Sequence, residues 1–111
     1  MNVAANAKFP SGSAIFCAAI AQSSRLFFND DGLNFTTTYT PGISLIEPGI
    51  TPVSSITLAY PTCTEWENTC FQARVDCGVH FPASVAAAPG IGHPIADLVY
   101  DFVQRHINGN P

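Results

Sequence analysis

Apolar and polar side chains alternate without a break from Phe71 to Phe81, and this pattern constrains the fold more than any other feature of the chain. Strict alternation is the period of a strand with one buried face, because successive side chains of a strand point to opposite sides. A second alternating stretch runs from Val53 to Tyr60 and ends at Pro61. The two stretches predict a pair of long antiparallel strands joined by the polar loop 62–69.

Three shorter strands are predicted upstream, at residues 13–21, 35–39 and 43–46. The first follows a Pro-Ser-Gly-Ser turn, the second is rich in threonine and aromatic residues, and the third follows a Pro-Gly turn. The apolar run Ala14–Ala21 also resembles the core of a signal peptide, but the proline and glycine before it favour a buried strand. This run is far shorter than the ~20 apolar residues that a membrane helix needs.

The last part of the sequence changes to a helical period. Pro94 suits the first helical position, basic residues occupy the last turn, and Asn108-Gly109 is a stop signal. An apolar stripe at helical spacing is expected to pack on a partner surface and consists of Ile95, Leu98, Val99 and Phe102. Residues 82–88 are compatible with one further helical turn.

The balance of charged and apolar residues adds an argument about assembly. Only 11% of the residues are charged and 47% are hydrophobic, which leaves little polar cover for a monomer. About five strands at ~4.8 Å spacing make a sheet roughly 24 Å wide, whereas one helix is only about 10–12 Å across. We therefore expect a single α+β domain over residues 1–111 that forms an obligate homodimer, with the helix of each subunit covering the rest of its partner's sheet.

The four cysteines do not have the spacing of a zinc site. Structural zinc ligands come in pairs separated by two to four residues, and only Cys77 and His80 are that close; on a strand they would point to opposite faces. Cys17 and Cys77 read as small buried residues. Cys63 and Cys70 flank the predicted loop, where they either pair with each other, cross-link neighbouring chains, or remain free thiols.

No catalytic constellation is evident in the sequence. The three histidines, His80, His93 and His106, are not accompanied by a nucleophile elbow, a zinc-protease motif or a phosphate-binding loop. His106 suits the end of the helix, His93 a turn and His80 the polar face of a strand. We therefore expect a protein without enzymatic activity, cofactor or metal.

Residues 54–81, with their two strands and intervening Cys63 and Cys70, resemble the coat proteins of single-stranded RNA bacteriophages, and the resemblance extends through the helix 95–108. It implies an antiparallel sheet, formed by an N-terminal hairpin and a meander, followed by a C-terminal helix. It also implies interlocked dimers with one continuous sheet, which assemble into an icosahedral shell around single-stranded RNA. The expected location is the virion, assembled in the cytoplasm of a bacterial host, with no membrane partner.

The resemblance also assigns roles to individual residues. It places RNA contacts on the inner face of the sheet, at Ser55, Thr57, Gln72, Arg74 and Asp76. Arg74 is the best candidate for an RNA phosphate or base edge; the alternative is a plain ion pair with Asp76 or with a carboxylate on a neighbouring strand.

Contacts between subunits would come from the loop. The resemblance implies inter-subunit disulfides at Cys63 and Cys70 and a contact of Trp66 at a capsid axis. The net charge of −4, with only four basic residues, supports assembly better than RNA binding. The alternative function is that of a small secreted binding or effector protein containing a disulfide.

Overall fold

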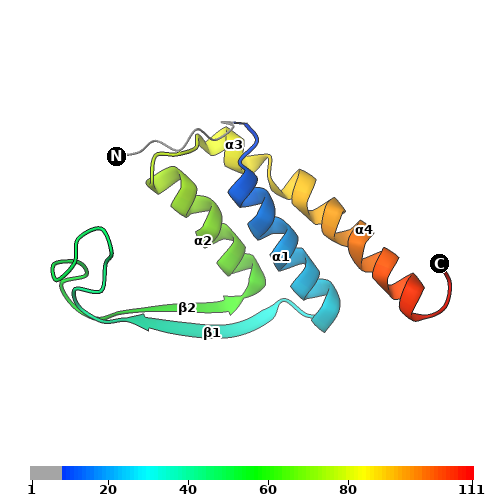
Figure 1. Cartoon of the computed structure of the whole chain (residues 1–111), viewed down its shortest axis with the longest axis horizontal. Coiled ribbons are helices and arrows are strands. Elements are labelled where there is room, and N and C mark those ends of the chain that lie inside the picture. Colours follow the sequence, from blue (N-terminus) through cyan, green and yellow to red (C-terminus); the bar gives the residue numbers. More distant parts are fainter. Residues whose placement is uncertain (1–8) are drawn as a thin grey trace.

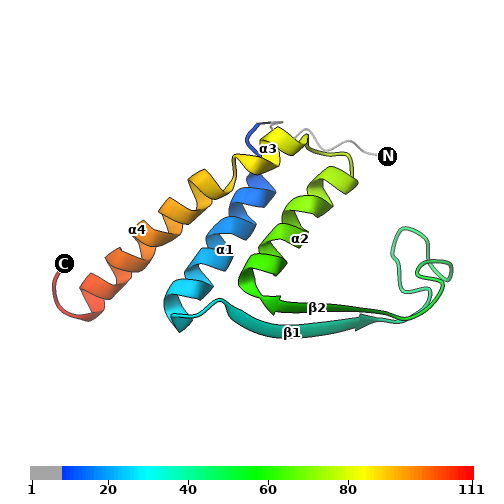
Figure 2. The same cartoon turned by 180° about the vertical axis from the view of Figure 1, so that it is seen from behind.

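The computed structural model describes residues 9–111 and is mostly helical (Figure 1). In chain order the elements are α1 (Gly12–Phe28), β1 (Gly32–Tyr39), β2 (Ile56–Thr62), α2 (Cys63–Asp76), α3 (Pro82–Ala86) and α4 (Pro89–Ile107). Helix α1 lies between α2 and α4, and the β1–β2 hairpin extends to one side (Figures 1 and 2). The predicted α+β fold, with a large sheet shared across an interlocked dimer, is therefore wrong.

Helix α1 covers residues for which a strand was predicted. Ser11 caps it, because its hydroxyl accepts a hydrogen bond from the amide of Ala14 at 3.3 Å. The buried residues Ala14, Ala18 and Ala21 recur at helical spacing and form one face. In a short apolar run, the spacing of apolar residues does not distinguish a strand from a helix. Here the buried alanines are spaced as in a helix.

Helix α2 replaces both the predicted loop and most of the predicted strand 71–81. The Thr62 hydroxyl accepts from the amide of Glu65 at 3.1 Å and caps the helix, which ends before Gly78 with its positive φ of 69°. Phe71 and Val75, four residues apart, pack on one cluster. These two residues therefore lie on one face of a helix. Over this short stretch the apolar residues also alternate with polar ones, which is why the pattern predicted a strand.

The hairpin contains the strands that were predicted best. Residues 35–39 lie within β1 and pair with β2 in antiparallel register, with Phe35 opposite Tyr60 and Thr38 opposite Thr57. Strand β2 begins at Ile56 rather than Val53. Residues 43–46 form no strand and belong to the long connection between the two strands.

The C-terminal helix confirms the predicted helical period but starts earlier than expected. Helix α3 occupies most of the predicted turn 82–88, and α4 begins at Pro89, which places Pro94 inside the helix. Helix α4 ends at Ile107, and Gly109 has a φ of 74°, as the stop signal predicts. No helix in the described part of the chain is long and apolar enough to cross a membrane.

Small side chains allow the helices to approach closely. Ala14 and Ala88 form a buried cluster with Val85. A methyl group added at Gly92 of α4 would lie 2.6 Å from the Cβ of Ala18 in α1. The absence of a side chain at this glycine therefore sets the distance between α1 and α4.

Candidate functional site

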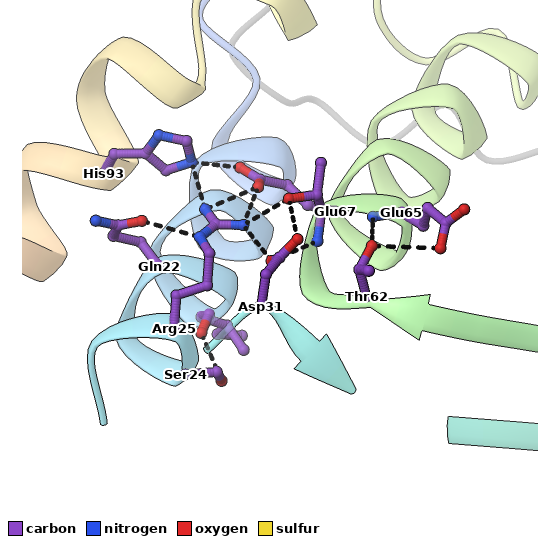
Figure 3. Close-up of polar contacts among 10 residues, drawn as sticks. Gln22, Ser24, Arg25, Asp31, Thr62, Glu65, Glu67 and His93 are labelled. Carbon is purple, nitrogen blue, oxygen red and sulfur yellow. Dashed lines mark hydrogen bonds and ion pairs between the residues drawn. The ribbon is translucent and has the colours of Figure 1, made fainter. Parts of the chain in front are cut away.

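A cluster of charged side chains connects α1, α2 and α4 (Figure 3). Glu67 of α2 is only 4% exposed. One of its oxygens, Oε2, accepts from Arg25 Nη1 at 3.2 Å and Nη2 at 3.1 Å. The other, Oε1, lies 2.6 Å from Nε2 of His93 in α4. The buried carboxylate therefore contacts a partner from each of the neighbouring helices.

The position of the proton on His93 follows from these contacts. Its Nε2 atom lies 3.2 Å from Arg25 Nη2, which can only donate, and 2.6 Å from the Glu67 carboxylate, which can only accept when ionised. A separation of 2.6 Å requires a proton between nitrogen and carboxylate oxygen. His93 therefore donates from Nε2 to Glu67.

Further polar groups complete the cluster. Asp31 accepts from the amide of Thr64 at 3.1 Å and from its hydroxyl at 2.8 Å, and Arg25 Nε donates to Gln22 at 3.0 Å. Burial, together with the nearby Asp31 carboxylate, raises the pKa of the Cys63 thiol. Because the charged groups of this cluster are paired with one another, we assign it a role in joining the helices rather than in binding a ligand.

A second polar group lies at the opposite end of α1 and α2; we call it the α1 N-terminal site and define it as Ser11, Gly12, Arg74, His80 and Ser84. A chain of contacts joins its members. The amide of Ser11 donates to the carbonyl of Ser84 at 3.1 Å, the Ser84 hydroxyl lies 3.5 Å from His80 Nδ1, and the amide of His80 donates to the carbonyl of Arg74 at 3.3 Å. Residues far apart in sequence thus meet at one place.

This site has unused hydrogen-bond donors. The amides of Gly12 and Ser13, in the first turn of α1, donate to no residue in the described part of the chain. Arg74 Nε is buried and has no hydrogen-bond partner among the described residues. The N-terminus of α1 is the positive end of its helix dipole, and Arg74 brings a positive charge to the end of α2. Such an arrangement suits a tetrahedral oxyanion.

His80 is the buried imidazole of this site, with 7% exposure. The contact of its Nδ1 with Ser84 leaves Nε2 available, since no contact of Nε2 occurs in the described part of the chain. The turn after α2 holds the ring in place, because the amides of Val79 and His80 both donate to the Arg74 carbonyl. The prediction that His80 lies on the polar face of a strand is therefore wrong.

The predicted RNA contacts do not share a surface of one sheet. Gln72, Arg74 and Asp76 lie on α2, whereas Ser55 precedes β2 and Thr57 lies within it. Gln72 donates to Asp76 at 2.7 Å. The alternative expectation of an Arg74–Asp76 ion pair is wrong, because the ion pairs of the described residues do not include one.

Of the alternatives for Cys63 and Cys70, mutual pairing is wrong and a free thiol is found for Cys63 alone. Cys70 forms a disulfide with Cys17, with their Cα atoms 6.4 Å apart and a sequence separation of 53. Cys63 is a buried free thiol, and Cys77, expected to be buried, is exposed. Trp66 lies on α2 rather than on a loop, beside Cys63 in a groove of about 220 Å³.

The stripe predicted to form a dimer lies on α4. Ile95, Leu98, Val99 and Phe102 are between 47% and 71% exposed. Burial of this stripe against a partner surface stays a prediction.

One sequence signal for the α1 N-terminal site was present, but it was interpreted as a turn before a strand. Ser11 followed by Gly12 precedes an apolar run, which is a helix N-cap as well as a turn pattern. The period-two reading of residues 71–81 concealed His80, because it assigned this residue to a solvent-facing side. Only the turn after α2 shows that His80 is directed inward.

Comparison with known proteins identifies the domain. The family model described as the VCPO second helical-bundle domain matches residues 1–109. The chain belongs to this family. Two solved structures, described as the apo-type and the holo-type bacterial vanadium-dependent chloroperoxidase, are each 40% identical to this VCPO-type domain over 90% of its length, with TM-scores of 0.86 and 0.87.

The domain spans about a fifth of the solved chains it matches, 22% and 21% respectively. No curated protein matches it.

These findings overturn the functional predictions. The resemblance to RNA-phage coat proteins is wrong, and with it the capsid function and the virion location. The alternative of a secreted binding protein is not supported either. The expectation of a protein without enzymatic activity is also wrong, because the solved relatives are chloroperoxidases, an enzyme family, of which this chain corresponds to one helical domain.

Proposed function

We propose that this chain is the vanadate-binding helical domain of a vanadium-dependent chloroperoxidase-like protein, and that the α1 N-terminal site contributes to the binding of vanadate. The observation that carries the proposal is the buried Nε of Arg74, which has no hydrogen-bond partner among the described residues, in the segment that the turn to His80 and Ser84 connects to the first turn of α1. A buried donor without an acceptor is costly, and an oxyanion would satisfy it.

The residues present fit a tetrahedral oxyanion that contains a metal. Gly12 leaves open space, since a Cβ there would meet no atom within 4 Å. The amides of Gly12 and Ser13 and the Arg74 guanidinium would bind the oxygen atoms, and His80 would approach the metal through Nε2, since an imidazole nitrogen is a common metal ligand. When bound, vanadate supplies the metal centre at which a chloroperoxidase uses peroxide to oxidise chloride.

The chain's own residues would position the anion and exclude water. Ser11 holds the first turn of α1 in place through its cap and its bond to Ser84. The contact between Ser84 and His80 fixes the orientation of the imidazole ring. The site therefore resembles a preformed binding site, in which the donors are aligned before the anion arrives.

The proposal is tested by titrating the chain with orthovanadate and with inorganic phosphate, using calorimetry and vanadium NMR. We expect saturable binding of both anions at one site, weakened about tenfold or more, or ~1.4 kcal/mol, by Arg74→Ala or His80→Ala. Arg105→Ala is the matched control, because Arg105 is an exposed cation of α4 that pairs with Asp101. Absence of binding, or equal binding by all variants, would refute the proposal.

A further inference from the structure

We propose that the Cys17–Cys70 disulfide regulates the α1 N-terminal site: the oxidised chain holds the site in its anion-binding geometry, and reduction of the disulfide weakens anion binding. This inference rests on the proposed function, because it concerns the same site. It is carried by the position of the disulfide relative to the two helix ends that supply the donors.

The disulfide joins the two helices close to the site. Cys17 lies in α1 six residues after the cap Ser11, and Cys70 lies one turn before Arg74 in α2. The chain runs from α1 to α2 through the hairpin at the far end of both helices (Figure 1). At the end that forms the site, no direct chain connection between α1 and α2 exists, so the disulfide is the covalent link there.

The non-covalent contacts at the two ends of the helix pair differ in kind. At the hairpin end, the ion pair of Arg25 with the buried Glu67 joins α1 to α2. Near the site, the buried core consists of Ala14, Ala88 and Val85, with Phe71 and Val75 beside it. The buried members are two alanines and one valine, whereas Phe71 and Val75 are only partly buried, and stabilisation by burial scales with the apolar area removed from water. The disulfide adds a covalent constraint to these apolar contacts and limits the separation of the two helices near the site.

The redox step is a thiol–disulfide exchange. A dithiol reductant transfers two electrons and two protons to the disulfide; the sulfur–sulfur bond breaks, two cysteine thiols form, and the dithiol becomes a cyclic disulfide. Both cysteines are only partly buried, which gives a small reductant access. Once the link is broken, the first turn of α1 and the end of α2 that carries Arg74 are free to separate, and a less preorganised site binds its anion more weakly.

The test measures phosphate binding by calorimetry with the chain oxidised and after reduction, because phosphate is not itself reduced by a dithiol. Thiol titration defines the two states as two and four free cysteines. We expect about tenfold weaker binding after reduction. The Cys17→Ser/Cys70→Ser variant should bind weakly in both states, whereas the control Cys77→Ser should respond to the reductant like the unmodified chain.

Hydrogen exchange provides a readout that does not depend on any anion. Amides 12–16 at the start of α1 should exchange faster after reduction, while amides near Arg25, at the other end of the helix, should not change. Unchanged exchange at the start of α1 in the reduced chain would overturn this inference. Absence of phosphate and vanadate binding in the oxidised chain, accompanied by the expected exchange pattern, would instead refute the proposed function and leave the mechanical coupling standing.

Discussion

The close approach of α1 and α4 at Gly92 gives a quantitative prediction. In the Gly92→Ala variant, the new methyl group would lie 2.6 Å from the Cβ of Ala18 and 2.7 Å from the carbonyl oxygen of Ile15. Neither atom can move by a simple side-chain rotation, so the helices must shift apart. Gly90 is the matched control on the same helix, because a Cβ at Gly90 would meet no atom within 4 Å.

Two opposing effects set the size of the change. Replacing a glycine by alanine inside a helix is favourable by up to about 1 kcal/mol, whereas inserting a methyl group into a tightly packed contact costs about 1–3 kcal/mol. We therefore expect Gly92→Ala to lower the free energy of unfolding by about 1–2 kcal/mol. Gly90→Ala should leave this free energy unchanged or raise it by a few tenths of a kcal/mol, roughly, since the glycine lies in the first turn.

Urea denaturation monitored by circular dichroism measures both variants. For a domain of this size, each kcal/mol corresponds to roughly 4–8 °C in Tm, so thermal melts should separate the two variants by about 5–15 °C. Equal stability of Gly92→Ala and Gly90→Ala would show that the α1–α4 contact is not set by the missing side chain, and the packing argument would fail.

Two further predictions concern the charged cluster and its neighbour. Glu67→Ala should destabilise the fold by about 3–5 kcal/mol, because it leaves Arg25 and His93 without their buried partner; in the control Asp101→Ala, loss of an exposed pair should cost less than about 1 kcal/mol in the same urea titrations. Burial raises the pKa of Cys63 above its ordinary value of 9.0, so the unfolded chain loses this proton at lower pH than the folded chain. Stability should therefore fall as the pH rises above 9, less so in Cys63→Ala; a parallel decline in both proteins would contradict the assignment.

The comparison of sequence and structure shows where local patterns were sufficient. The strand at residues 35–39 was correct because threonine and aromatic residues favour extended backbone and Pro41-Gly42 ends it. The end of α4 was correct because Asn108-Gly109 stops a helix through a glycine at positive φ. Both features depend on residues next to one another in the chain.

The helices α1 and α2 were missed for a common reason. A short apolar run has no clear period, so its pattern is compatible with a strand or a helix, and the choice depends on which neighbour buries it. In α1 the buried alanines match the narrow space beside Gly92, and in α2 Phe71 and Val75 meet the cluster around Val85. Those partners lie far along the chain, so sequence periodicity alone could not select them.

The candidate site was predicted only in part. Arg74 was singled out as an anion-binding cation, but its proposed ligand was RNA, and Ser11 and Gly12 were read as a turn. The other residues with a predicted role lie elsewhere on α2, α4 and the hairpin. The site becomes visible only when the start of α1, the end of α2 and the turn leading to α3 are brought together.

Residue types and near neighbours were enough to predict the hairpin strand and the final helix, because both depend on local preferences along the chain. Three contacts follow from the packing of the helices alone: Cys17 pairs with Cys70, Glu67 is shared by Arg25 and His93, and His80 contacts Ser84, which bonds to the cap of α1. Each of these contacts joins residues on different elements, and their energy is gained only when the helices pack. A site built from residues on different helices cannot be predicted from the spacing of those residues along the sequence.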